Sequence, residues 1–470
     1  MLANEERRID IRFIASMLAC GIMSFSGVVV ETAMNITFPV LMSEFGVDTA
    51  TVQWVTTGYL LMLTAIMPLS SYLKRRFKMK VLFAVAITFF LAGTILCALA
   101  PAFAFLIIGR LFQGVGTGVA LPLMFNIVIE QAPLDKMGLM MGVATLITAT
   151  APAVGPSVGG LIVTCWGWRM IFVVLLPFLI ASAFTGIASI RQVSATQKAK
   201  FSVLQFVLIA AGFSCLVFGA NAAAESGWLS ARVLLLLLGG VALLVLFGVA
   251  SLRSNNPLIR VSIFRKVPFT LSVLYVVLLS SIVLGLGYLI PYYAQTVCSS
   301  SALVAGCLLL PGCIIGAILA PLGGRILDVF GARGPLTFGA ICQFVAILLF
   351  MGLALGNAVW VFAAVYVLIP IAQGFSMANS ITNGLRFLPE ELKADGNAAF
   401  NTLQQLGGAL GTAIVTSIVG SAQAGVLQDL VAGTIIGTQE GFFALLAISG
   451  IAMVCLLVVC LLMKRNSKKA

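Results

Sequence analysis

Several kinds of functional group are scarce or absent in this chain. No histidine occurs among its 470 residues, and only 9% of them are charged, against about 25% in soluble domains. The ten cysteines are scattered, with no CxxC pair, so we expect neither structural disulfides nor a zinc site. A phosphate-binding GxxxxGK[ST] loop is also missing, which argues against an ATPase within the chain. The sequence therefore predicts no enzyme, no metal and no cofactor.

Long apolar runs dominate what is present, since 61% of the residues are hydrophobic. A helix needs about 17 to 25 apolar residues to cross a bilayer. Segments of that length begin near Phe13, Thr51, Val81, Ala102, Gly138, Trp168, Phe201, Ala231, Phe269, Ala302, Leu336, Ala358, Asn397 and Gly441. We therefore predict an all-α integral membrane protein with fourteen transmembrane helices. Because the number is even, both termini lie on one side.

The net charge of +12 follows the topology of the chain. Lys and Arg cluster in alternate connections and in both tails, namely Arg7 to Arg12, Lys74 to Lys80, Arg191 to Lys200, Arg253 to Lys266, Arg325 to Arg333, Arg386 to Lys393 and Lys464 to Lys469. By the positive-inside rule these connections and both termini are cytoplasmic. The distribution of Lys and Arg thus indicates the orientation of the chain in the lipid bilayer, and we predict no nucleic-acid partner.

An internal repeat divides the chain. Ser71 to Lys78 follows the second predicted helix and Gly324 to Arg333 follows the tenth. They occupy equivalent places in two six-helix units if the seventh and eighth helices are an inserted hairpin. Parallel halves of this kind are a transporter arrangement with the substrate site at their interface. The predicted units are a tail (1–12), an N-terminal bundle (13–190), a linker with the hairpin (191–266), a C-terminal bundle (267–463) and a tail (464–470).

Glu31 is the acidic residue that lies inside a long apolar run, whereas the others can be placed at helix ends or in loops. A carboxylate at that depth is costly, so we interpret it as a proton or cation site facing a polar cavity. At 1.5 Å per residue, Glu31 and Arg110 lie at similar depths, about 15 and 12 Å from the outer end. Arg110 and burial act in opposite directions on proton binding, so their separation could switch it. A structural ion pair, or a site that only attracts cationic substrates, remains an alternative.

Further motifs follow Glu31 in a fixed order. Helix 1 carries Glu31-Thr-Ala-Met-Asn-Ile-Thr-Phe-Pro39, helix 4 carries Arg110-Leu-Phe-Gln113-Gly114-Val-Gly116, and helix 5 ends in Gly155-Pro156-Ser-Val-Gly159-Gly160. Together they resemble the major facilitator superfamily, specifically its fourteen-helix drug:proton antiporter branch, almost end to end. The resemblance implies that Glu31 binds the proton, that Arg110 modulates it, and that Gly155, Pro156, Gly159 and Gly160 seal and bend helix 5. Close glycine packing between helices is the alternative for that segment.

The resemblance also implies a cytoplasmic gate at the repeated loops. The predicted gate residues are Arg75, Arg76, Gly324, Asp328, Gly331 and Arg333. The family's Asp helps to lock this side shut in the outward-open state, but Arg75 takes its place in the first copy, which puts the N-half latch in doubt. The second copy keeps Asp328. A topology anchor near anionic headgroups is the alternative for Lys74 to Lys80.

The candidate substrate cavity is chosen by position. Asn397, Asn401, Gln404 and Gly408 share one face of helix 13, and their amides need partners in lipid, either a neighbouring helix or a substrate. The predicted cavity residues are Met34, Asn35, Phe38, Trp54, Tyr59, Gln113, Tyr292, Tyr293, Met377, Asn401, Gln404 and Gln405.

The sequence thus predicts a monomeric antiporter of a bacterial plasma membrane that exports amphiphilic or cationic drugs in exchange for protons. An exporter of an endogenous metabolite or lipid is the leading alternative, and a non-transporting membrane sensor is a third. Because Glu31 is the one acid expected to be well buried, we also expect few protons per cation and poor transport of divalent cations.

Overall fold

The protein is described here by a computed structural model that covers residues 9–47, 49–196, 201–254, 256–354, 359–426 and 429–467. The outer parts of both predicted tails, together with Lys198, Lys200 and the predicted helix start at Ala358, lie outside these ranges. Within them the chain folds into helices joined by short connections, and no strand is formed. The predicted all-α class is confirmed.

The N-terminal half contains six membrane-crossing helices or helix runs. Its elements are α1 (Ile11–Met34), η1 (Asn35–Thr37), α2 (Phe38–Phe45), α3 (Thr49–Val52), α4 (Trp54–Ile66), η2 (Met67–Leu69), α5 (Ser70–Arg76), α6 (Met79–Ala98), α7 (Phe103–Gln131), η3 (Leu134–Lys136), α8 (Met137–Trp166) and α9 (Arg169–Ser189). The hairpin follows as α10 (Val203–Ser226) and α11 (Ala231–Arg253).

The C-terminal half begins after a short helical turn in the linker. Its elements are η4 (Val261–Arg265), α12 (Val267–Thr296), α13 (Ala302–Cys307), α14 (Leu310–Phe330), α15 (Arg333–Leu349), the π-helix η5 (Phe350–Ala354), α16 (Val359–Tyr366), α17 (Leu368–Arg386), η6 (Glu390–Leu392), α18 (Lys393–Gly425) and α19 (Leu430–Ser467). Helix α19 thus extends into the segment assigned to the C-terminal tail.

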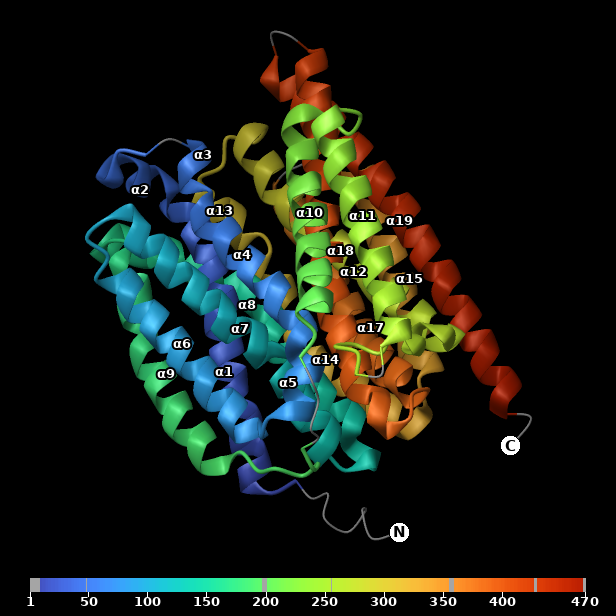
Figure 1. Ribbon diagram of the computed structural model, residues 1–470. Coiled ribbons are helices and arrows are strands. Elements are labelled where there is room, and N and C mark those ends of the chain that lie inside the picture. Colours follow the sequence, from blue (N-terminus) through green and yellow to red (C-terminus); the bar gives the residue numbers. More distant parts are fainter. Residues whose placement is uncertain are drawn as a thin grey trace.

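Thirteen helical runs among the described residues are long and apolar enough to cross a membrane, and the bent helix α8 makes a fourteenth. This agrees with the predicted count. The connection between the last two helices is short, because α18 ends at Gly425, α19 begins at Leu430, and both extend past the apolar core. Gln423 joins the two extensions by donating to Thr434 Oγ1 at 2.8 Å. Figure 1 shows them projecting beyond the other helices.

Polar side chains mark where the first helix begins. Asp10 accepts a hydrogen bond from the backbone N–H of Phe13 at 2.7 Å and pairs with Arg191 at 2.8 Å. A side-chain acceptor at this position satisfies a helix N–H that has no partner within the helix. This N–H bond, aided by Arg191, holds the pKa of Asp10 below its usual value. The pair also ties the start of α1 to the connection after α9.

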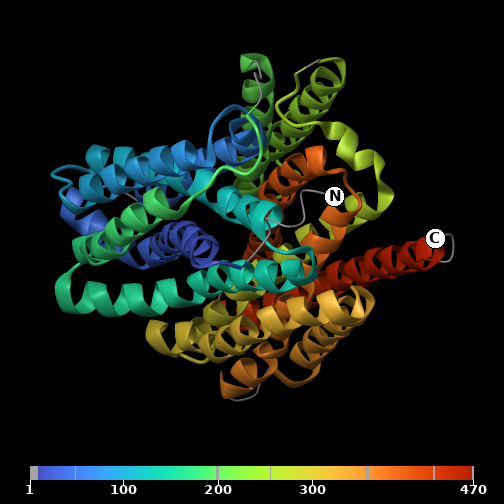
Figure 2. The same cartoon turned by 90° about the horizontal axis from the view of Figure 1, so that it is seen from below.

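The start of helix α1 and the end of helix α19 lie at the same end of the bundle, at the bottom of Figure 1. The connections that carry the Lys and Arg clusters lie there too, and we call it the basic end. Figure 2 looks onto it: the blue-to-teal N-terminal helices and the yellow-to-red C-terminal helices form two groups, and the green hairpin lies at their edge. Helix α10 packs against both α4 and α18, so the hairpin covers one seam between the halves.

The apolar cores show where the halves join. One core at the basic end includes Phe83 of the N-terminal half, Leu327 of the C-terminal half and Phe247 of the hairpin. At the opposite end each half has its own core, around Phe172 and around Phe350. Helix α8 packs along α14 and also touches α13. The halves therefore share buried apolar surface mainly at the basic end.

Candidate functional site

Arg110 on α7 is fully buried among neutral partners. Its Nε donates to the carbonyl of Val55 at 2.9 Å and its Nη1 donates to Gln113 Oε1 at 2.8 Å. Gln113 in turn donates to Thr94 Oγ1 at 2.9 Å. The guanidinium lies over the ring of Tyr59, 4.3 Å from its centroid, where a cation is attracted to the π face. Nη2 has no hydrogen-bond partner among the described residues.

Tyr59 links Arg110 to the first helix. A Cβ built on Gly27 would lie 3.0 Å from the Tyr59 hydroxyl and would overlap Thr117. The absence of a side chain at Gly27 therefore lets α1 approach α4 and α7 closely. Glu31 lies one helical turn further along α1, on the same face. The fold thus brings Glu31 to the level of Arg110, as the sequence predicted from depth.

Glu31 remains half-buried although α1 is packed by α7, α8 and α9. The Arg110 guanidinium is close enough to act on its carboxylate electrostatically. Glu31 belongs to no ion pair within the described ranges. A carboxylate and a guanidinium at one depth thus each keep an unused hydrogen-bonding atom, and they can hold a proton or a polar ligand group between them.

Two of the predicted hinge residues, Gly155 and Gly159, pack against the α1 residues that follow Glu31. A Cβ on Gly155 would overlap Thr32, and one on Gly159 would lie 2.6 Å from Ala33 Cβ. Gly160 is less constrained, since its nearest neighbour would be Ile36 at 3.8 Å. Helix α8 bends by 46° between Leu134–Pro152 and Ser157–Trp166. The side chain of the predicted hinge residue Pro156 lies outside the described part of the chain.

The predicted cavity residues fall into two groups. Asn35 is exposed, Phe38 is half-buried, and Trp54 is 48% exposed with its ring against Phe218 of α10. Met34, Tyr59, Gln113, Tyr293 and Met377 are buried. Tyr293 packs on Phe362 in the C-terminal core, 4.9 Å between centroids, while half-buried Tyr292 accepts a hydrogen bond from Gln423 at 2.9 Å. Exposed surface in this state remains on the first group and on Tyr292, Gln404 and Gln405.

The amide stripe of α18 makes contacts between helices. Asn397 Nδ2 donates to the carbonyl of Pro122 at 3.0 Å and to Asn126 Oδ1 at 3.1 Å, both on α7. Asn401 donates to Asn397 Oδ1 at 2.9 Å. Gln404 and Gln405, further from the basic end, are half-buried. Of the two roles predicted for the stripe, helix contact across the halves thus applies to Asn397 in this state, and Asn401 supports Asn397 from within α18.

Asp328 joins the halves at the basic end. Its carboxylate, on α14, accepts the backbone N–H groups of Gly138 and Leu139 at the start of α8, both at 2.9 Å. A negative charge is favoured there by the dipole of α8. Gly324 approaches Gly138 so closely that a Cβ on either would meet the other's backbone or Asp328. Arg386 adds a half-exposed ion pair at 3.3 Å.

Arg75 joins the halves along the other seam, although the sequence left this copy of the gate in doubt. Its Nη1 lies 3.2 and 3.3 Å from the two carboxylate oxygens of Asp395 at the start of α18, and Ser71 also donates to Asp395. Asp395 is fully buried and was missed by sequence reasoning. Asp395 follows an acidic helix start, Glu390-Glu391-Leu392-Lys393. The sequence therefore indicated only a helix end exposed to water.

The remaining predicted gate residues make none of these contacts between halves. Arg76 and Arg333 are exposed. Gly331 ends α14 with a positive φ of 84°, and a Cβ there would meet nothing within 4 Å. A left-handed conformation favours glycine, so Gly331 fits a role in ending the helix.

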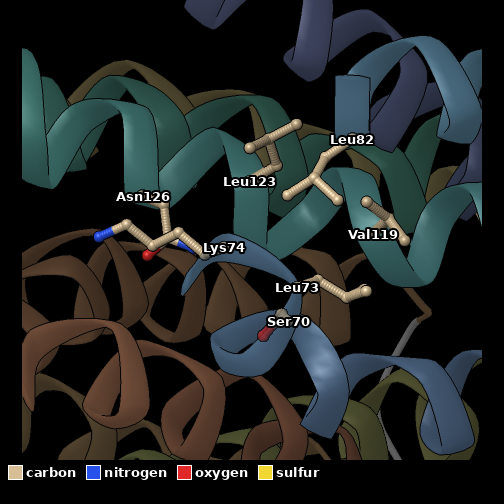
Figure 3. A pocket seen from close by; sticks show the side chains of 7 residues that line it. All are labelled: Ser70, Leu73, Lys74, Leu82, Val119, Leu123 and Asn126. Atoms are coloured by element: carbon tan, nitrogen blue, oxygen red, sulfur yellow. The ribbon is translucent and has the colours of Figure 1, made fainter. Parts of the chain in front are cut away.

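Glu31 is not the one well-buried acid, which corrects an expectation from the sequence. Besides Asp395, Glu130 at the end of α7 is 8% exposed and pairs with Lys74 at 2.6 Å. Beside this pair is a small pocket between α5, α6 and α7, lined by Ser70, Leu73, Lys74, Leu82, Val119, Leu123 and Asn126 (Figure 3). Asp395 is buried where the two halves meet, whereas Glu130 is bound by Lys74 of its own half and by Ser194 of the linker. The pocket contains none of the predicted cavity residues.

Comparisons with known proteins agree with this architecture. The family model described as Major Facilitator Superfamily matches residues 17–412. The lincomycin resistance protein LmrB of Listeria monocytogenes is 37% identical over 97% of both chains, and that of Bacillus subtilis is 37% identical over 87% of this chain and 85% of that protein. A multidrug resistance protein B homolog of Mycobacterium tuberculosis is 29% identical over 88% of this chain and 77% of that protein.

A solved structure shows the same fold at low sequence identity. The crystal structure of the human organic anion transporter MFSD10 (TETRAN) matches with a TM-score of 0.64, covers 94% of this chain and 99% of that one, and is 13% identical. Fold, family model and relatives thus agree on a multi-pass membrane transporter rather than a catalyst. The chain belongs to the Major Facilitator Superfamily.

Proposed function

We propose that this protein exports amphiphilic or cationic drugs in exchange for protons, by alternating access across a bacterial plasma membrane. The observation that carries the proposal is Glu31, a half-buried carboxylate without an ion-pair partner among the described residues, at the level of the buried guanidinium of Arg110. Ionisable groups inside a membrane bundle are costly and occur where protons or ions are handled. We therefore assign proton binding during transport to Glu31 and Arg110.

The closed basic end and the separate cores at the opposite end support an outward-facing state. In that state Glu31 exchanges with the outside, and a proton bound there removes its charge. The two halves, 13–190 and 267–463, then rock about the central site until the basic end opens. Loss of the proton on that side restores the charge, which attracts a cationic drug. The bend in α8 beside Thr32 and Ala33 gives the helix next to Glu31 a place to flex.

Drugs are proposed as substrates because the relatives carry resistance names, and lincomycin is the first compound to test. The half-exposed residues Asn35, Phe38, Trp54 and Tyr292, with Gln404 and Gln405, offer aromatic and amide contacts suited to amphiphiles. We further propose a monomer with both termini in the cytoplasm, supported by the Lys and Arg clusters at the basic end.

The test is drug-driven proton movement in proteoliposomes that contain a pH-sensitive dye. With the native protein, adding lincomycin or a cationic dye should release protons from loaded vesicles, and a protonophore should abolish the signal. Glu31→Gln keeps the size of the side chain but cannot change charge, so it should lose coupling. Coupling that survives in Glu31→Gln would refute the role of Glu31. A folded native protein that moves no drug would redirect the search to metabolites or lipids.

A further inference from the structure

The inserted hairpin contributes to the closed basic end through the linker that follows it. While Nη1 of Arg75 faces Asp395, Nη2 of Arg75 donates to the carbonyls of Pro257 at 2.6 Å and Leu258 at 2.9 Å. The backbone N–H of Arg260, in the same linker, donates to Asp395. The linker thus contacts both members of the ion pair that joins the two halves.

Both helices of the hairpin hold this stretch of linker in place. Gln205 on α10, 3% exposed, accepts the backbone N–H of Leu258 at 2.8 Å and donates to the carbonyl of Ala250 at 3.3 Å. Ser251 on α11 donates to the carbonyl of Ile259 at 2.6 Å. Leu258 is itself buried, against Leu69 and Tyr72. The carbonyl groups that accept hydrogen bonds from Arg75 are therefore held in place by Gln205, by Ser251 and by the packing of Leu258.

We propose that the linker segment 257–260, positioned by Gln205 and Ser251, is the third component of the gate at the basic end and gives the inserted hairpin its function. A guanidinium has five N–H donors in a rigid fork, and here the fork is divided between a carboxylate of one half and carbonyls of the linker. Opening this seam separates Arg75 from Asp395, so the linker, which contacts both, must lose at least one of these contacts. The hairpin thereby stabilises the outward-facing state, with Gln205 and Ser251 acting as positioning residues through Arg75. This inference rests on the alternating access proposed above, but not on proton coupling or on the identity of the drug.

The experiment follows accessibility at both ends of the full-length protein in membrane vesicles. Thr145, 4% exposed on α8, lines a small pocket together with Ala317 and Gln373 at the junction of the halves, so Thr145→Cys reports opening of the basic end. Asn35→Cys reports opening of the other end, where Asn35 is exposed. A membrane-impermeant maleimide is applied to inside-out and right-side-out vesicles, and the parent chain gives the background from its native cysteines.

Gln205→Ala and Ser251→Ala should each raise the labelling rate of the Thr145→Cys reporter about fivefold, the shift expected for one buried hydrogen bond. Each should lower labelling of the Asn35→Cys reporter, because opening one end closes the other. The matched control is Ser214→Ala, also in the hairpin, whose hydroxyl bonds only to the carbonyl of Ala210 within α10; it should match the parent.

Two results would overturn the proposal. The first is that Gln205→Ala and Ser251→Ala both label like Ser214→Ala, which would show that the linker does not hold the gate. The second is that both reporters label faster, which would show general loosening and no change in the direction of opening. If Gln205→Ala does not fold, as judged by size-exclusion chromatography, Ser251→Ala decides the question. Neither readout requires a substrate, so failure here is distinguishable from failure of drug:proton exchange.

Discussion

Removing the carboxylate of Asp328 should open the basic end. Asp328 is almost fully buried and accepts two backbone N–H groups of α8 across the halves. Hydrogen bonds to a charged group contribute about 1.5 to 3 kcal/mol each, so about 3 kcal/mol is a low estimate for the two. Because 1.4 kcal/mol is a factor of ten, Asp328→Ala should shift the balance toward the open basic end by more than about 100-fold. Asp328→Asn keeps one neutral acceptor and should shift it less.

The assay is a distance distribution from double electron–electron resonance between spin labels at Lys80 and Glu391. Both positions are exposed at the basic end, one on each half. Asp328→Ala should populate a longer distance and Asp328→Asn an intermediate fraction of it. Arg386→Ala is the matched control, since its pair with Asp328 is 42% exposed on the arginine side and exposed pairs contribute little. An unchanged distribution in Asp328→Ala, or an equal shift in Arg386→Ala, would refute the reasoning.

Three further results are expected. Gly159→Val should uncouple transport and lower the thermal stability, because its side chain would overlap Ala33 behind Glu31, and overpacking costs about 1 to 3 kcal/mol; drug efflux equal to the parent would contradict this. Asn397→Ala removes two bonds across the halves, one to Asn126, worth about 1 kcal/mol each; the spin-label distance should lengthen in more molecules. Asp10→Asn should lower Tm by about 1 °C at neutral pH. Because the backbone N–H that it caps lowers the folded-state pKa of Asp10, its contribution is present above the unfolded-state pKa and is lost as pH falls through the folded-state pKa. The difference in Tm should therefore disappear in acid.

The two repeated loops make related contacts with the opposite half. Arg75 stands at the repeat position of Asp328, and Asp395 stands as far after Pro389 as Leu139 stands after Pro133 (395 − 389 and 139 − 133). In one half an acid meets the backbone N–H groups of a helix start, and in the other a base meets an acid at the equivalent helix start. Arg75 thus pairs with Asp395 across the halves. The sequence revealed the Arg at position 75 but not its partner, because the two residues are 320 positions apart.

The sequence by itself determined the membrane class, the helix count and the depth of Glu31 and Arg110. These depend on local properties: the length of an apolar run, the charge of a connection, and a fixed rise per residue. It also marked the glycines of α8, because close helix approach requires them wherever the partner lies. Only the tertiary structure decided which polar groups meet. In the sequence Asp395 looked like an ordinary helix-end acid, yet it is buried because it meets Arg75 of the other half. The linker after the hairpin became part of the gate because α10 and α11 hold it beside Arg75. Burial at an interface between distant segments depends on how the halves are placed together, and no local pattern records that placement.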